Sequence, residues 1–154
     1  MEIRRAAPAD LPALAPLFDR YRQFYGQPSD PDRAWRFLAE RLERGESVVF
    51  MGFEARRALG FVQLYPGFSS VSAARTFVLN DLYVEADRRG SGTGRGLVAA
   101  ATAHAREAGA VSLSLQTGVA NDAARRLYES LGWMRETRFL DYGLSLVTAA
   151  IVEG

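Results

Sequence analysis

Apolar side chains recur every three or four residues in the first third of the chain, which is the spacing of one face of an α-helix. Leu14, Phe18 and Tyr21 follow this spacing within residues 8–26, and a second such pattern occupies residues 33–45. A polar stretch, QPSDPD, separates the two patterns. The chain is therefore predicted to form two consecutive helices near its N-terminus.

Apolar runs bounded by glycine, proline or polar residues predict strands in the rest of the chain. The predicted strands cover residues 2–6, 47–55, 58–68, 74–84 and 110–118, with one or two closing strands within residues 133–149. Helical spacing returns over residues 96–109 and 121–132. This alternation predicts an α/β fold in which one mixed sheet carries helices on both faces.

Length and composition indicate one domain without metal or disulfide chemistry. The 154 residues, 48% of them hydrophobic, suffice to bury a sizeable core, so we expect a single domain over residues 1–154. A net charge of +1 gives no general attraction to nucleic acid or to an anionic membrane. The chain has no cysteine, and its single histidine, His104, lies in an alanine-rich helical stretch where no metal site is expected. No signal segment or membrane-spanning run is evident, and we expect a cytoplasmic protein.

Four glycines lie within seven residues in the stretch GSGTGRG, residues 90–96, directly after the predicted strand 74–84. The phosphate loop of nucleotide hydrolases needs a lysine, and all 19 basic residues of this chain are arginine. The dinucleotide fingerprint G-x-G-x-x-G fails too, because Arg95 and Leu97 stand where its third glycine would be. A flexible loop or a different kind of anion site remains.

An anion site explains the glycines best. A helix that begins near Thr93 presents backbone N–H groups without intrahelical partners, and its dipole adds partial positive charge. Such a turn binds anions when no side chain blocks the approach. We expect Gly90, Gly92 and Gly94 to clear the approach of a phosphate or pyrophosphate, and Arg89 and Arg95 to add charge-assisted contacts.

Two motifs resemble the signatures of the GCN5-related N-acetyltransferases, the GNAT superfamily. Arg89-x-x-Gly92-x-Gly94 is similar to the signature R/Q-x-x-G-x-G/A, whose loop holds the pyrophosphate of coenzyme A. The stretch NDAARRLYESLGW is similar to the second signature, N-x-x-A-x-x-L-Y-x-x-x-G-F, with Trp133 in place of the usual phenylalanine. The resemblance is specific over residues 76–133, and the stretch LNDLYV is most similar to the subgroup related to yeast histone and polyamine acetyltransferases.

The resemblance implies a mixed, mostly antiparallel sheet of six or seven strands with a splayed central pair. It also implies acetyl-CoA as the acyl donor and no metal. The backbone of the strand that ends at Val84 would pair with the pantetheine arm, in a gap opened by a bulge near Asn80–Leu82. Together, the two lines of reasoning name as coenzyme-binding residues Leu82, Tyr83, Val84, Arg89, Gly90, Ser91, Gly92, Thr93, Gly94, Arg95 and Asn121.

Tyr128 is the expected general acid. Transfer of an acetyl group from a thioester to an amine expels a thiolate, and a phenol with a pKa of about 10 can donate a proton to that leaving group. With no cysteine available, we expect the amine to attack directly in a ternary complex. Asn80 stands where several relatives carry a glutamate, so Asp81 is the candidate base, acting directly or through water, and Glu85 and Asp87 lie further along. A structural carboxylate with a water chain to solvent is the alternative for Asp81.

The acceptor is expected to be a primary amine of a small molecule or peptide, but its identity does not follow from the sequence. Candidate pocket residues are Tyr21, Arg22, Tyr25, Trp35, Tyr65, Phe68, Arg75 and Tyr142. The alternative function is a non-catalytic acyl-CoA sensor that contacts a protein partner. The resemblance also implies a homodimer, because many members of the family dimerise through C-terminal strands, and the stretch FLDYGLSLVTAAIV is apolar enough to form such a buried edge.

Overall fold

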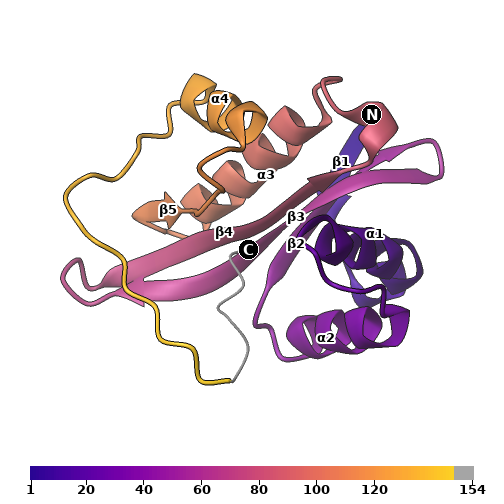
Figure 1. Cartoon of the computed structure of the whole chain (residues 1–154), viewed down its shortest axis with the longest axis horizontal. Coiled ribbons are helices and arrows are strands. Elements are labelled where there is room, and N and C mark those ends of the chain that lie inside the picture. Colours follow the sequence, from indigo (N-terminus) through magenta and orange to yellow (C-terminus); the bar gives the residue numbers. More distant parts are fainter. Residues whose placement is uncertain (148–154) are drawn as a thin grey trace. The chain divides into compact units, whose positions relative to one another are not determined.

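Five strands form a single sheet in a computed structural model that describes residues 1–147 of the chain (Figure 1). The strands are β1 (Glu2–Arg5), β2 (Val48–Glu54), β3 (Arg57–Ser69), β4 (Ala74–Val84) and β5 (Ser112–Ser114). They lie in the order in which they occur in the sequence. All neighbours are antiparallel except β4 and β5, which run parallel. The mixed, mostly antiparallel sheet predicted from the sequence is confirmed.

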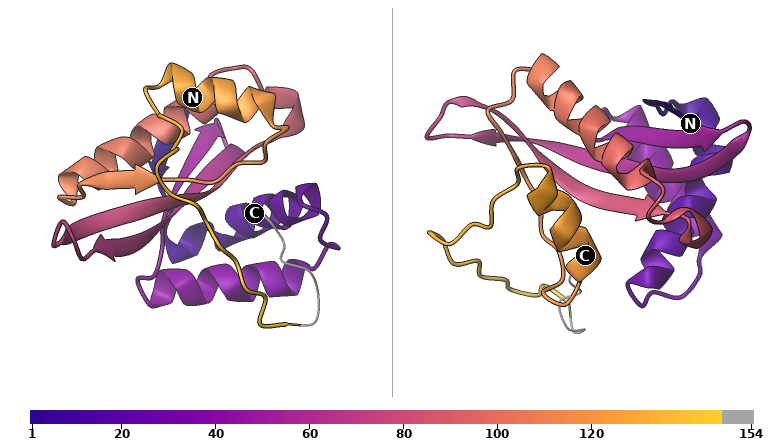
Figure 2. Two further views of the ribbon diagram at one scale, coloured as in Figure 1. Left: turned by 60° about the vertical axis from the view of Figure 1, so that its left-hand side comes forward. Right: turned by 90° about the horizontal axis from the view of Figure 1, so that it is seen from above.

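Helices cover both faces of this sheet, as Figures 1 and 2 show. On one face are α1 (Leu11–Phe24) and α2 (Pro31–Glu43); on the other is α3 (Thr93–Glu107). Short 3₁₀ turns precede α1 and α3: η1 (Pro8–Asp10) and η2 (Ala86–Arg88).

The core beneath α1 and α2 contains the aromatic rings of Phe18 and Phe61, whose centroids lie 6.2 Å apart. On the opposite face, the ring of His104 lies edge-on to Phe50 and to Phe77, at 5.7 Å from each centroid. Burial beside these rings lowers the pKa of the imidazole. His104 therefore has a packing role.

A β-bulge interrupts the pairing of β3 with β4. Gln63 lies opposite Asp81, and the next residue of β3, Leu64, lies opposite Leu79, so that Asn80 has no partner on β3. The extra residue turns Asp81 toward the face of α1 and α2, while Leu79 keeps to the face of α3. The bulge predicted near Asn80–Leu82 is thus confirmed.

The sheet opens beside the second half of β4. Pairing with β5 is confined to the three residues from Thr76 to Val78. From Leu79 to Val84, every residue of β4 except Asn80 pairs with β3, but this half of the strand has no strand neighbour on its β5 side within residues 1–147. This is the splayed pair of the predicted fold.

The number of strands is smaller than the six or seven expected. Residues 133–147 form no strand, and the last two positions of the predicted closing strands, 148 and 149, lie outside the described residues. The fifth strand spans three residues instead of the nine predicted over 110–118. An apolar run forms a stable strand only where a neighbouring strand pairs with it. Phe139 and Leu140, two apolar residues of the predicted closing strands, are 70% and 82% exposed.

Contacts divide the chain into two compact units, Met1–Leu115 and Gln116–Gly154. The first contains the sheet and helices α1 to α3. The second contains α4 (Asp122–Ser130). No helix within residues 1–147 has the length and apolarity needed to cross a membrane.

Candidate active site

The glycine-rich turn between β4 and α3 has the geometry of an anion site. Gly90 and Gly92 have φ angles of +77° and +93°, in the left-handed region that favours glycine. Helix α3 begins at Thr93, as expected, and Gly92 caps it without a side-chain hydrogen bond. A Cβ atom added to Gly90 or Gly92 would meet nothing within 4 Å. The approach to the turn is therefore open at these two positions.

The hydroxyl groups of Ser91 and Thr93 interact inside this turn. Thr93 is only 1% exposed, and its Oγ1 lies 3.2 Å from Ser91 Oγ. Ser91 Oγ also donates a hydrogen bond to the carbonyl of Arg88. The hydroxyl groups of both expected coenzyme-binding residues thus interact within the turn, where Ser91 is exposed and Thr93 is buried.

Gly96, the last glycine of the cluster, lies close to β1. A Cβ atom on Gly96 would lie 2.5 Å from Ile3 Cδ1, the flexible end of a side chain that would have to shift. Gly94 lies in the first turn of α3 and is half-buried. Gly96 therefore differs from Gly90 and Gly92, whose surroundings are open.

The two arginines expected at the turn are placed differently. Arg89 Nε donates to the carbonyl of Val84 at 3.0 Å, and its guanidinium lies over the rings of Phe24 and Tyr83 at 5.5 and 5.6 Å. Arg89 is thereby folded back over the end of β4. Arg95 is exposed on the first turn of α3.

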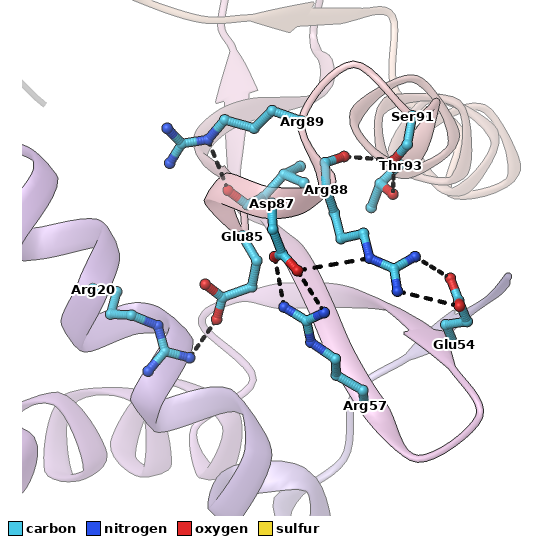
Figure 3. Close-up of polar contacts among 10 residues, drawn as sticks. Arg20, Glu54, Arg57, Glu85, Asp87, Arg88, Arg89, Ser91 and Thr93 are labelled. Atoms are coloured by element: carbon cyan, nitrogen blue, oxygen red, sulfur yellow. Dashed lines mark hydrogen bonds and ion pairs between the residues drawn. The ribbon is translucent and has the colours of Figure 1, made fainter.

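An ion-pair cluster fixes the segment that leads into the turn (Figure 3). Its members are Arg20, Glu54, Arg57, Glu85, Asp87 and Arg88. Arg57 binds both carboxylate oxygens of Asp87, at 2.9 and 2.6 Å, and Arg88 binds Glu54. These contacts join the β2–β3 hairpin to η2. Each exposed pair adds little alone, but together they restrain the turn from two sides.

Two of the three candidate bases belong to this cluster. Glu85 is bound to Arg20 on α1, and Asp87 is bound to Arg57 and Arg88. The Arg57 guanidinium holds the pKa of Asp87 below its ordinary value. A carboxylate with a lowered pKa is a weaker proton acceptor, so Asp87 is poorly suited to act as a base.

Asp81, the third candidate, is buried beneath α1 with 2% of its surface exposed. Its Oδ1 accepts a hydrogen bond from Asn80 Nδ2 at 2.8 Å, and its Oδ2 accepts one from Gln63 Nε2. Burial raises the pKa of the Asp81 carboxyl, and these hydrogen bonds oppose the rise. Sequence reasoning did not identify Gln63, although a lone amide within the apolar run FVQLY was a signal that could have been followed.

Tyrosines surround this carboxyl. Tyr21 donates from its hydroxyl to the carbonyl of Asn80 at 3.3 Å, and its ring lies 5.0 Å from that of Tyr25. Burial, and then the Asp81 charge, raise the pKa values of Tyr21, Tyr25 and Tyr65. Three of the candidate acceptor residues therefore gather near Asp81.

Other candidate acceptor residues are exposed. Trp35, Phe68 and Tyr142 are 42%, 76% and 91% exposed. The Arg75 guanidinium lies 4.7 Å from the centroid of the Phe68 ring.

Helix α4 carries the two remaining site candidates. Asn121 is its N-cap, and its Oδ1 accepts a hydrogen bond from the N–H of Ala124 at 3.2 Å. This cap leaves the amide nitrogen, Nδ2, as the atom suited to the expected contact with pantetheine. Tyr128 is the buried residue of α4, and its ring lies 5.6 Å from that of Trp133 at an angle of 56°.

The described residues contain no group of three or more His, Cys, Asp or Glu side chains arranged to hold a metal ion.

Comparison with known proteins agrees with this fold. The Acetyltransferase (GNAT) family matches residues 12–133. An uncharacterized N-acetyltransferase of Bacillus subtilis, YhfO, is 47% identical over 146 residues, covering 95% of this chain and 98% of YhfO. The crystal structure of a probable acetyltransferase, 40% identical, superposes with a TM-score of 0.92 over 97% of this chain and all of that one. The protein belongs to the GNAT family and is an N-acetyltransferase.

A more distant relative has a named substrate class. Aminoglycoside N(6')-acetyltransferase type 1 of Stenotrophomonas maltophilia is 28% identical over 152 residues, covering 96% of this chain and 95% of that one.

Proposed function

We propose that this N-acetyltransferase transfers the acetyl group of acetyl-CoA to a primary amine by direct attack within a ternary complex. The observation that carries the proposal is the turn at Gly90 and Gly92, where open space surrounds the two glycines just before the N-terminus of α3. The first N–H groups of a helix lack intrahelical partners and bind anions at such a position. A pyrophosphate has the charge and the acceptor oxygens that such a turn binds. The residues present therefore fit coenzyme A.

The open edge of β4 supports the same ligand. Leu82, Tyr83 and Val84 pair with β3 on one side and lack a strand neighbour on the other within the described part of the chain. Their backbone groups are suited to the two amides of a pantetheine arm, which would add to the sheet as a further strand does. A backbone N–H at this edge is also suited to stabilise the oxyanion formed at the thioester carbonyl.

The proton balance assigns a role to each catalytic candidate. Acetyl-CoA supplies an activated acyl group. Asp81 accepts a proton from the ammonium form of the substrate, directly or through a water molecule, because an alkylamine with a pKa of about 10.4 is almost wholly protonated near pH 7. The amine nitrogen then bonds to the acetyl carbon and the carbon–sulfur bond breaks. Tyr128 donates its phenolic proton to the leaving sulfur and is reprotonated, through solvent, by the proton that the amine nitrogen loses as the amide forms. The proton held by Asp81 is released to solvent.

The first experiment combines thiol release with calorimetric binding of acetyl-CoA. Release of free thiol with a panel of primary amines, including an aminoglycoside because of the relative named above, is expected from the wild-type enzyme. Binding without thiol release for any amine would favour the acyl-CoA sensor instead.

We expect Tyr128→Phe to lower kcat by roughly 10- to 1,000-fold with little change in affinity for acetyl-CoA, because only the proton donor is removed. Ser130→Ala is the matched control, since it removes a hydroxyl from the same helix that donates to the carbonyl of Leu127. An unchanged kcat in Tyr128→Phe would exclude the general-acid role.

The single-domain organisation, the homodimer, the cytoplasmic location and the likeness to yeast histone and polyamine acetyltransferases stay predictions. Analytical ultracentrifugation tests the dimer directly.

A further inference from the structure

The side chains of Gln63 and Asp81 form a polar pair inside the core beneath α1. Gln63 is 0% exposed and Asp81 is 2% exposed. Their positions follow from the bulge at Asn80, which sets these two residues directly opposite each other on β3 and β4. A buried pair of this kind is costly unless its polar atoms are satisfied. The hydrogen bonds that each polar atom of the pair makes therefore determine how costly its burial is.

In the described part of the chain, both carboxylate oxygens of Asp81 have hydrogen-bond partners, whereas only the nitrogen of the Gln63 amide has one. Both oxygens of Asp81 accept hydrogen bonds, from Gln63 Nε2 and from Asn80 Nδ2. The carbonyl oxygen of Gln63, Oε1, is buried and has no hydrogen-bond partner within the described residues. An orphaned acceptor in the core is unfavourable, and native structures contain few of them.

A proton on Asp81 would reverse this arrangement. A protonated carboxyl group gains one O–H donor, and Gln63 Oε1 is the acceptor that lacks one. A half-turn of the amide exchanges Nε2 for Oε1 with almost no change of shape. Gln63 thus offers a donor to the ionised carboxylate and an acceptor to the protonated acid.

We propose that Gln63 is a positioning residue that sets the proton affinity of Asp81, its amide turning over when the carboxyl group takes up the proton of the acceptor ammonium. This inference rests on the proposed role of Asp81 as the base. In the forward step, the proton passes from the ammonium nitrogen to Asp81 Oδ2, directly or through a water molecule, and Gln63 changes from donor to acceptor. Loss of the proton to solvent restores the original orientation.

The surroundings of the pair agree with this role. The groups that face Asp81 are the phenols of Tyr21 on α1, of Tyr25 directly after α1 and of Tyr65 on β3. Arg41 on α2 acts on Tyr65. Burial raises the pKa of Asp81 toward the range in which a base can hold a substrate proton. The Gln63 amide opposes this rise by stabilising the ionised form, so it limits how tightly the proton is held.

Gln63→Leu tests the proposal because leucine fills a similar volume and can neither donate nor accept. The titration of Asp81 is followed by the infrared band of its protonated carboxyl, assigned by its loss in Asp81→Asn. The acid limb of kcat/KM is followed by thiol release. Without the amide, both midpoints are expected to rise by roughly one pH unit, because the hydrogen bond lost by the ionised carboxylate is stronger than the one lost by the protonated acid. Gln63→Met, whose side chain adapts to irregular spaces, gives the same measurement if the leucine variant does not fold.

Leu38→Ala is the matched control for general destabilisation. Leu38 is completely buried on α2 and is not one of the residues assigned to Asp81 or to the coenzyme. This variant should lose stability and keep both midpoints. If neither midpoint moves in a folded, active Gln63 variant, the role of Gln63 is refuted and the proposed function stands. If the infrared midpoint moves and the kinetic limb does not, Asp81 is not the base, and both the inference and that part of the proposed function fail.

Discussion

Substitution of Gly92 by alanine separates the binding role of the glycine turn from its conformational role. Gly92 has a φ angle of +93°, and a Cβ atom there would enter open space in front of α3. Gly109, just beyond the other end of the same helix, has a φ angle of +77° and equally open surroundings. Gly109→Ala is therefore a matched control that introduces the same kind of backbone strain away from the proposed pyrophosphate site.

The expected stability loss is similar in the two variants. A non-glycine residue in the left-handed region costs about 1–2 kcal/mol. For a chain of 154 residues, this corresponds to a fall in Tm of about 3–6 °C. Differential scanning calorimetry of both proteins measures this common effect.

Only Gly92→Ala should affect the coenzyme. A methyl group in front of the first helical turn weakens hydrogen bonds to a charged ligand, each of which contributes about 1.5–3 kcal/mol. We expect KM for acetyl-CoA to rise about 10- to 100-fold. The assay is thiol release at saturating amine. Equal KM values for Gly92→Ala, Gly109→Ala and the wild type would refute the assignment of this turn to pyrophosphate.

Two further predictions concern stability. A Cβ atom on Gly60 would lie 2.4 Å from the carbonyl oxygen of Tyr83, which is a backbone atom. Gly60→Ala should therefore force β3 away from β4 and reduce the free energy of unfolding by about 2–3 kcal/mol or more, measured by urea denaturation. An unchanged urea midpoint would contradict the close approach of the two strands. Asp19 accepts hydrogen bonds from Ser29 Oγ at 2.6 Å and from the N–H of Asp30 at 2.8 Å, and such bonds lower its pKa against the effect of burial. Its ionised form therefore stabilises the fold above the pKa of an unfolded aspartate, and this contribution is lost as the pH falls through the lower folded value. Asp19→Asn should lower stability by about 1–2 kcal/mol at pH 7, with a difference from wild type that shrinks in acid; a difference independent of pH would contradict this reasoning.

Local patterns predicted the elements that bring the glycine turn into place. Residues 74–84 were predicted as a strand, and β4 has these bounds. The start of α3 near Thr93 followed from the glycines before it. Both results depend on short-range rules, namely apolar runs that form strands and glycine at helix ends. They needed no knowledge of distant contacts.

Contacts between residues that are distant in the sequence determine the features that local patterns did not predict. The opposition of Gln63 and Asp81 depends on the register of β3 against β4, and the single unpaired residue, Asn80, shifts that register. The ion pair of Arg20 with Glu85 joins residues 65 positions apart in the sequence. The roles expected of Tyr128 and Asn121 were drawn from motif spacing and stay predictions.

The cations of the ion-pair cluster beside the glycine turn are all guanidinium groups: Arg20, Arg57 and Arg88. A lysine in the same positions would present a primary amine next to a reactive thioester and, once acetylated, would lose its charge. Guanidinium stays protonated at any physiological pH and is a poor nucleophile. The cations of the ion-pair cluster are thus side chains that the enzyme's own acyl donor does not acetylate. Repeated turnover therefore leaves their charges, and the ion pairs that restrain the turn, intact.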